Sequence, residues 1–186
     1  ADLAEPDRML RLLQGDVGSG KTVVAALLAC RAIEAGYQVA FMAPTEILAE
    51  QHFLKLRDWL EPLGVSIAWL AGSLGKSLKR AMLAQAAGTA QLVVGTHALI
   101  QESVDFARLG LVIVDEEQRF GVLQRLALRH EGNNPHQLMM SATPIPRTVA
   151  MTVFGDLDVS TLRELPAGRA PITTHVVPAR DRPAYL

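Results

Sequence analysis

The chain has 186 residues, of which 49% are hydrophobic, and this length and composition suit one globular domain with a substantial core. With 18 Lys and Arg against 19 Asp and Glu, the net charge of -1 excludes the global basic field of a free-standing nucleic-acid binder, so any DNA contact has to be local. The single cysteine, Cys30, excludes an intramolecular disulfide, and no apolar run approaches the roughly 20 residues that span a bilayer, so no membrane contact is expected.

Short apolar segments rich in β-branched residues alternate with longer segments of helical spacing. This alternation predicts an α/β fold in which a mainly parallel sheet is covered by helices on both faces. The expected strands are residues 9–14, 38–43, 65–70, 91–95, 109–114 and 137–141.

Two helices are predicted with clear ends, and a third is expected up to about residue 87. The first begins after Lys21, contains Cys30 as a small buried residue and ends at Gly36, and the second runs from Thr45 to just before Pro62. Apolar residues at helical spacing mark the faces expected to pack on the sheet: Val24, Leu27, Leu28 and Ala32 in the first helix, and Leu56, Trp59 and Leu60 in the second.

Residues 15–22 read GDVGSGKT and match the complete P-loop pattern between a predicted strand and a predicted helix. Glycines permit a compact turn whose backbone N–H groups converge on phosphate oxygens, at the positive end of the following helix. Lys21 is expected to contact the β- and γ-phosphates, and Thr22 to coordinate magnesium. The predicted nucleotide-binding residues are Gly15, Asp16, Val17, Gly18, Ser19, Gly20, Lys21 and Thr22. A structural turn would need neither the lysine nor the hydroxyl.

Residues 111–116 read LVIVDE, an apolar strand that ends in two carboxylates, where open α/β sheets place ligand chemistry. Asp115 is the candidate magnesium ligand, and Glu116 the candidate base for the attacking water. Alone, this pair is often only a helix cap, but beside a P-loop it favours catalysis. The loop itself does not tell ATP from GTP, although the NKxD motif by which GTPases read guanine is not found.

Five segments of the chain resemble, in their order, the motifs of superfamily 2 helicases, and their residues are similar to those of the RecG family of branched-DNA helicases. They are GDVGSGKT at residues 15–22, APTEILAEQH at 43–52, VVGTHAL at 93–99, DEEQRFG at 115–121 and SATPIPRT at 141–148. The resemblance runs from about Met9 to about Pro171.

The resemblance implies a RecA-like P-loop NTPase domain, the first of two that form the motor and hold ATP with Mg²⁺ in the cleft between them. A Pro- and Gly-rich segment follows Leu165, so we expect the domain over residues 1–165 and, over 166–186, a linker towards the second RecA-like domain. The other implied partners are branched DNA and an amino-terminal DNA-binding module. The implied location is the bacterial cytoplasm.

The family's track for single-stranded DNA falls on Pro44 and Thr45, and on Gly95, Thr96 and His97. These residues stand where strands end and helices begin, and free N–H groups at such positions suit a phosphate. Threonine is also a favoured helix N-cap that needs no ligand.

Family analogy makes Ser141, Ala142 and Thr143 the link between nucleotide state and DNA grip. Gln118, in the turn after the strand-end carboxylates, and Arg147, which could pair with a carboxylate near the cleft, are further candidate coupling residues. For Arg147, the interpretation as an ordinary surface arginine is about as good as a role in coupling. RecG-like sequences usually read DEQH, and the transcription-repair translocases DEEH, where this chain reads DEEQ, so Gln118 departs from both patterns.

The sequence thus predicts an ATP-dependent helicase or translocase that remodels forked and Holliday-type DNA in repair and recombination. Two alternatives stay open: a double-strand translocase that acts on stalled polymerase, and a nucleotide-gated DNA clamp with incidental hydrolysis. Glu116 argues against the clamp, because a pure clamp needs no base for water.

Overall fold

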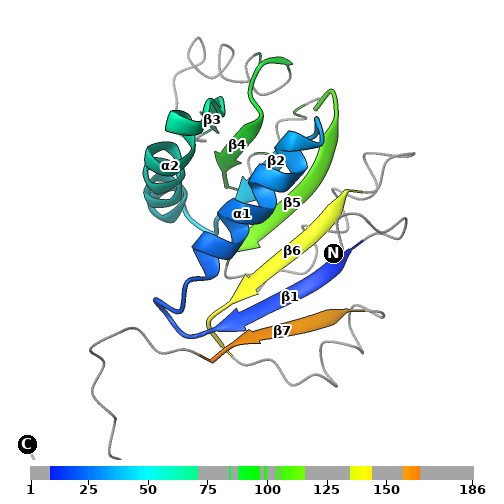
Figure 1. The fold of residues 1–186 in the computed structure, drawn as a ribbon. Coiled ribbons are helices and arrows are strands. Elements are labelled where there is room, and N and C mark those ends of the chain that lie inside the picture. Colours follow the sequence, from blue (N-terminus) through cyan, green and yellow to red (C-terminus); the bar gives the residue numbers. More distant parts are fainter. Residues whose placement is uncertain are drawn as a thin grey trace, which may run out of the picture.

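A parallel sheet in the order β3-β4-β2-β5-β6-β1-β7 forms the centre of the molecule in the computed structural model, which describes residues 9–70, 84, 88–96, 99, 104, 106–115, 135–143 and 157–163 (Figure 1). The strands are β1 (Leu10–Gly15), β2 (Gln38–Met42), β3 (Ile67–Leu70), β4 (Leu92–Gly95), β5 (Leu109–Asp115), β6 (His136–Ser141) and β7 (Asp158–Leu162). Every neighbouring pair runs parallel.

Two helices of the described chain, α1 (Lys21–Glu34) and α2 (Glu46–Leu60), follow β1 and β2, and a 3-10 turn at Glu61–Leu63 ends the second. Gly36 ends the first helix as predicted, since its φ of +84° is a left-handed conformation that glycine adopts without strain. The parallel sheet and these two helices confirm the predicted α/β class. Of the helix predicted up to residue 87, the structure describes only Ala84, which is helical, and the segment after Leu165 lies outside the described residues.

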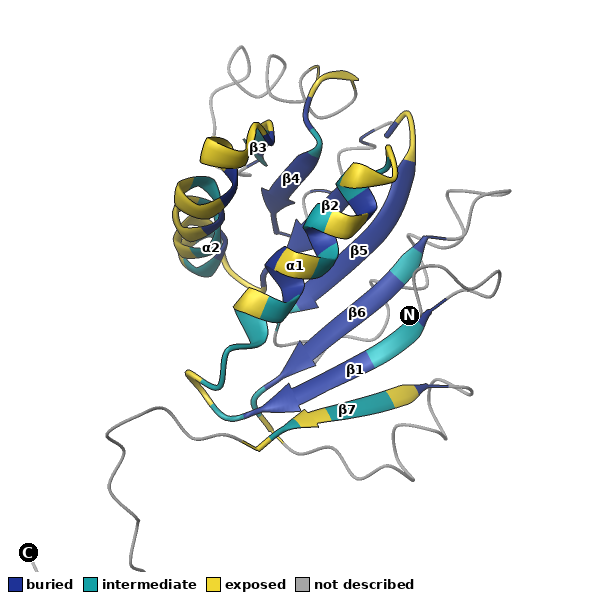
Figure 2. Cartoon of the chain, viewed as in Figure 1, coloured by how far each residue is buried: buried dark blue, intermediate teal, exposed yellow. Residues whose placement is uncertain are grey.

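Alternate residues of the strands point into two apolar clusters, one on each face of the sheet. Helices α1 and α2 cover one face, where Ala25 and Leu56 pack on strand residues such as Ile113 (Figure 2). The other face is also buried, since Val93 and Val112 are 0% exposed. Burial on both faces explains why the central strands are nearly all apolar.

Helical spacing predicted the packed faces only in part. In α1 the buried residues are Ala25, Ala26, Ala29 and Ala32, whereas Leu27, predicted to pack on the sheet, is 62% exposed. In α2, Leu56 and Leu60 are buried as predicted, but Trp59 is 40% exposed. The small alanines let α1 lie close to the sheet, Val24 and Leu28 pack beside them while partly buried, and Leu27 lies on the opposite side of the helix.

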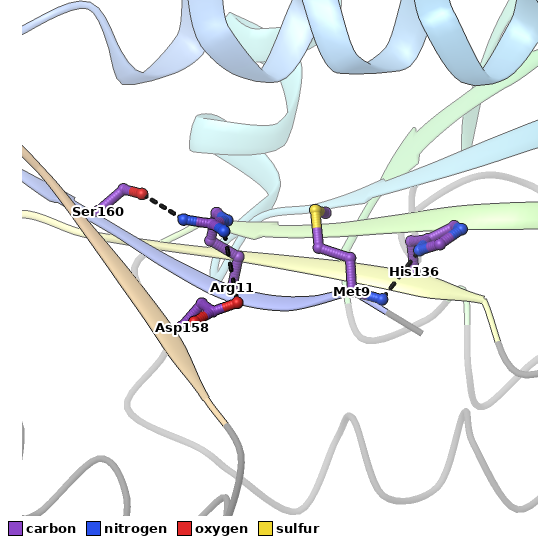
Figure 3. Close-up of polar contacts among 5 residues, drawn as sticks. All are labelled: Met9, Arg11, His136, Asp158 and Ser160. Carbon is purple, nitrogen blue, oxygen red and sulfur yellow. Dashed lines mark hydrogen bonds and ion pairs between the residues drawn. The ribbon is translucent and has the colours of Figure 1, made fainter. Parts of the chain in front are cut away.

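Strand β7 is the one described strand that the sequence pattern did not predict, and polar contacts join it to β1. Arg11 donates hydrogen bonds to Ser160 Oγ at 2.6 Å and to Asp158 Oδ2 at 3.4 Å (Figure 3). On the other side of β1, the Met9 amide donates to His136 Nδ1 at 2.9 Å. These contacts hold β1, and with it the start of the P-loop, between β6 and β7.

Within the described part of the chain, neither helix is long and apolar enough to cross a membrane.

Candidate nucleotide-binding site

The predicted site residues that the structure describes gather at one edge of the sheet. Gly15, Gly95, Asp115 and Ser141 are the last residues of β1, β4, β5 and β6, and Thr45 stands at the start of α2, just after β2. Because all strands run parallel, their carboxyl ends meet at this edge, where ligands bind in open α/β sheets. In Figure 1 the arrowheads of β5, β6, β1 and β7 point the same way.

The P-loop leaves β1 at Gly15 and enters α1 at Lys21, the strand-to-helix context that phosphate binding requires. The Lys21 ammonium folds back over the loop and donates to the backbone oxygens of Gly15 at 2.6 Å and Asp16 at 2.9 Å. An ammonium group has three donors, so one stays available for a phosphate oxygen. The loop therefore presents a positive charge that its own backbone holds in place.

Glycines and a serine shape the cradle. Gly18 and Gly20 have φ angles of 80° and 91°, which other residues rarely adopt. A Cβ on Gly15 would clash with the Ser19 hydroxyl and crowd Leu162, so a side chain there would displace Ser19. Within the described part of the chain, Ser19 Oγ is buried and meets no hydrogen-bond partner, and a polar atom left in this state favours a ligand that supplies one.

Asp115, the candidate magnesium ligand, ends the buried strand β5, and its carboxylate is paired with a histidine. His52 Nε2 on α2 lies 2.6 Å from Asp115 Oδ2, and the two side chains are 15% and 12% exposed. Sequence reasoning assigned His52 no role. Its position four residues before the buried Leu56 was the available signal, because a polar side chain on the buried stripe of a helix needs a partner.

The described residues fit a magnesium-bound nucleotide. Asp115 pairs in register with Met140, and Met140 with Leu13, so Asp115 lies two strand spacings, about 10 Å, from the end of β1. Thr22 stands in the first turn of α1, beside the loop. Magnesium bound with phosphates takes only one or two protein oxygens, which matches this sparse set. Glu116, the predicted base, lies outside the described residues.

Pro44 and Thr45, predicted to contact DNA, are exposed between β2 and α2. Thr45 Oγ1 accepts a hydrogen bond from the Leu48 amide at 3.3 Å, so the residue caps the helix. Capping and phosphate contact are compatible, because the cap occupies one of several free N–H groups at the helix start.

The second predicted DNA segment has clear structural reasons for its residues. A Cβ on Gly95 would meet the Leu70 carbonyl oxygen at 2.7 Å, so close packing of β4 on β3 requires glycine. Thr96 is 3% exposed, and its carbonyl accepts from the Leu99 amide at 3.0 Å. His97 lies outside the described residues, and DNA contact at this segment stays a prediction.

Ser141, Ala142 and Thr143, the predicted coupling segment, form a tight polar turn at the end of β6. Ser141 Oγ accepts from the Thr143 amide at 3.2 Å and lies 3.1 Å from Thr143 Oγ1. Ser141 also pairs in register with Gln14, directly before the P-loop. The turn is therefore placed beside the candidate phosphate site. The other predicted coupling residues, Gln118 and Arg147, lie outside the described residues.

Comparison with known families agrees with this geometry. Residues 3–152 match the DEAD/DEAH box helicase family, which is most of the chain. The chain belongs to this family. Membership explains why the phosphate loop and the strand-end aspartate occur together.

Among DEAD/DEAH box helicases, the chain is similar to curated proteins described as the ATP-dependent DNA helicase RecG. The Haemophilus influenzae protein is 58% identical over 186 residues, which cover 97% of this chain and 27% of that protein. The protein of Synechocystis is 55% identical over 183 residues, 98% of this chain and 22% of that protein. The resemblance predicted from the motifs is confirmed, and the chain spans about a quarter of the length of these relatives.

Solved structures of DEAD/DEAH box helicases and their relatives match as well. A structure of RecG bound to a three-way DNA junction superposes with a TM-score of 0.82 at 45% identity, covering 99% of this chain and 25% of that one. The helicase domain of Hef from Pyrococcus furiosus gives a TM-score of 0.62 at 18% identity, covering 87% of this chain and 37% of that one, and it supports the fold alone. The predicted RecA-like domain is confirmed.

Proposed function

We propose that this chain is the nucleotide-binding motor domain of an ATP-dependent DNA helicase that remodels branched DNA, such as stalled forks and Holliday junctions, in repair and recombination. The observation that carries the proposal is that the P-loop and Asp115 converge on one sheet edge in a chain 58% identical to RecG. The solved RecG structure holds a three-way DNA junction, which supports a branched substrate here.

In this proposal, Lys21 and the loop N–H groups hold the phosphates of ATP. Thr22 and Asp115 hold magnesium, which when bound neutralises charge on the phosphate oxygens. Glu116 orients and deprotonates the attacking water. The ammonium of Lys21 is already placed over the loop, so little reorganisation is needed on binding.

The DNA side of the motor lies along the same edge. The proposed contacts are Pro44, Thr45, Gly95, Thr96 and His97. The proposed link between nucleotide state and DNA grip consists of Gln118, Ser141, Ala142, Thr143 and Arg147. Exposed Pro44 and Thr45 are the most accessible of the described candidates.

The whole protein then needs parts beyond this domain. We assign residues 1–165 to the first RecA-like domain and 166–186 to a linker towards a second one, which supplies arginines to the phosphates. An amino-terminal module grips the junction. A protein that remodels bacterial DNA acts in the cytoplasm, which is the location we propose.

Phosphate release by the full-length protein tests the proposal, measured without DNA, with linear duplex and with a fork of the same length. We expect the fork to stimulate most, Lys21→Ala to abolish turnover, and Glu116→Gln to cut it roughly 10²-fold or more while nucleotide still binds. Equal stimulation of phosphate release by fork and linear duplex would favour a double-strand translocase. Phosphate release that DNA does not stimulate would favour a nucleotide-gated clamp. Either result contradicts the proposal.

A further inference from the structure

His52 and Asp115 form a polar pair between elements that are far apart in sequence. Nε2 and Oδ2 are 2.6 Å apart, across a separation of 63 residues. A carboxylate can only accept, so the imidazole Nε2–H is the donor. Both side chains are largely withdrawn from water, and such a charge-assisted hydrogen bond is short and directional.

The imidazole of His52 is held from two sides. The ring of Phe41, a buried residue of β2, lies with its centroid 4.8 Å from the imidazole centroid at an angle of 46°. Along α2, His52 shares its face with the buried residues Ala49, Leu56 and Leu60. Packing on Phe41 and anchoring of the helix on either side restrict the directions in which Nε2 can point.

This restraint acts on the carboxylate that the proposed function assigns to magnesium. With Oδ2 bonded to His52, the second oxygen of Asp115 is the one available to the metal or to a water in its shell. In metal sites, groups that hydrogen-bond a ligating side chain set its orientation, and their loss typically weakens metal affinity by about 10- to 100-fold.

Helix α2 extends the pair towards the proposed DNA segment. His52 follows Thr45 by seven residues, which corresponds to two turns, or about 10 Å, along the helix axis. Thr45 caps the helix, and Pro44 and Thr45 are exposed. One short, well-packed helix thus has a candidate DNA contact at its start and a contact with Asp115 two turns later.

We propose that His52 is a positioning residue: its imidazole orients the Asp115 carboxylate for magnesium and connects that carboxylate, through α2, to the DNA-facing end at Pro44 and Thr45. This inference rests on the proposed function and names a residue that transmits between the two sites. A shift of α2 on DNA would move the imidazole and with it the carboxylate, because the hydrogen bond and the Phe41 contact leave little slack.

The test compares variants of the full-length protein in binding a fluorescent ADP analogue, first in EDTA and then during titration with magnesium. His52→Leu removes the donor and keeps an apolar volume. His52→Gln keeps an N–H donor with similar reach, and His52→Asn keeps the amide but is one methylene shorter. Phe53→Leu is the matched control, because Phe53 lies on the same helix but stacks on Trp69, with ring centroids 5.6 Å apart.

We expect His52→Leu and His52→Asn to raise the half-saturating magnesium concentration about tenfold or more, with affinity in EDTA unchanged. His52→Gln should recover most of the loss, and Phe53→Leu should resemble the wild type. At saturating magnesium, the ratio of fork-stimulated to basal turnover should fall roughly 2- to 30-fold in His52→Leu and His52→Asn, but not in His52→Gln or Phe53→Leu. Asn against Gln gives the same comparison if the leucine variant does not fold.

The inference would be overturned if His52→Asn, His52→Gln and Phe53→Leu all required the same magnesium concentration. It would also be overturned if His52→Leu and His52→Asn lost as much affinity for the ADP analogue in EDTA as in magnesium. These outcomes differ from failure of the proposed function, in which the wild-type protein itself would bind no ADP analogue.

Discussion

Lys21 donates to two carbonyl oxygens of its own loop, so the ammonium group is in position before any phosphate arrives. The same contacts also stabilise the loop itself. Replacing Lys21 therefore has two effects: it removes a phosphate contact, and it releases the backbone of Gly15 and Asp16. Both effects lower the affinity for nucleotide.

Lys21→Ala should weaken binding of a fluorescent ADP analogue at least about tenfold, as expected when a charge-assisted hydrogen bond of roughly 1.5–3 kcal/mol is lost. Lys21→Arg keeps the charge but carries a planar head group that does not reproduce the ammonium geometry, so it should recover little. Equal affinities of wild type and Lys21→Ala in a fluorescence titration would refute the assignment of the loop.

Cys30 lies half-buried in α1, where burial and then the nearby Glu34 carboxylate raise the pKa of its thiol. The thiolate is the reactive form, so iodoacetamide at pH 8 should alkylate Cys30 more slowly in the folded protein than in the urea-unfolded protein. In the folded protein the alkylation rate should continue to rise at pH values above the ordinary pKa of a thiol. Glu34→Gln should speed the reaction moderately. A folded thiol that reacts as fast as the unfolded one would contradict this.

The raised pKa of Cys30 also gives the sign of its effect on stability. The folded protein holds the thiol proton more tightly than the unfolded chain, so this contribution is present below the unfolded pKa and is lost as the pH rises through the folded pKa.

At the scale of elements, close contact between β3 and β4 depends on Gly95. Gly95→Ala places a Cβ about 2.7 Å from the Leu70 carbonyl oxygen, a backbone atom that cannot rotate away. We expect a loss of about 1–3 kcal/mol in the free energy of unfolding, measured with urea in the absence of DNA.

Gly88→Ala is the control for Gly95→Ala, since Gly88 is exposed and an added Cβ there meets no atom of the described residues within 4 Å. It should be neutral or slightly stabilising. If Gly95→Ala folded as stably as Gly88→Ala and lost only DNA affinity, the glycine would serve the ligand rather than the sheet.

The strands were predictable where both faces of the sheet are buried, because a short unbroken apolar run such as residues 109–114 is typical of a strand at the centre of a parallel sheet. Strand β7 escaped prediction for the opposite reason. It lies at the edge of the sheet, none of its residues is buried, and its place depends on Arg11, which is 147 residues away from Asp158 and 149 from Ser160. The exposed side chains of Leu27 and Trp59 show a further limit of sequence-based prediction. The spacing of apolar residues indicates that a helix has a buried face, but it does not give the width of that face.

The candidate site was predictable to the extent that its parts are local. Residues 15–22 carry the loop's turn, charge and hydroxyl within one segment, and Asp115 follows its strand directly. The contact between His52 and Asp115 was not predictable, because it depends on where α2 lies on the sheet, which brings His52 beside Phe41 of β2 and Asp115 at the end of β5, and no sequence spacing encodes that distance.

At the scale of the whole molecule, the proposed function makes the chain one side of a motor cleft. We predict that these 186 residues alone do not separate strands in a fork-displacement assay and hydrolyse ATP slowly, because arginines contributed by a partner domain are worth roughly 10³ to 10⁵ in rate. The full-length protein in the same assay is the control. Robust unwinding by the isolated chain would refute the two-domain premise.

The position of β1 between β6 and β7 has a consequence for synthesis on the ribosome. Leu10 pairs with Gln137, and Gly15 with Leu162, so the strand that leads into the phosphate loop meets its partners only after more than a hundred further residues have been made. At roughly 5–20 residues per second, β1 waits on the order of 10 seconds as an apolar segment without a sheet. During that interval the nascent chain carries the P-loop sequence without the neighbouring strands that hold the loop in place, so a preformed phosphate site exists only once β6 and β7 have been made.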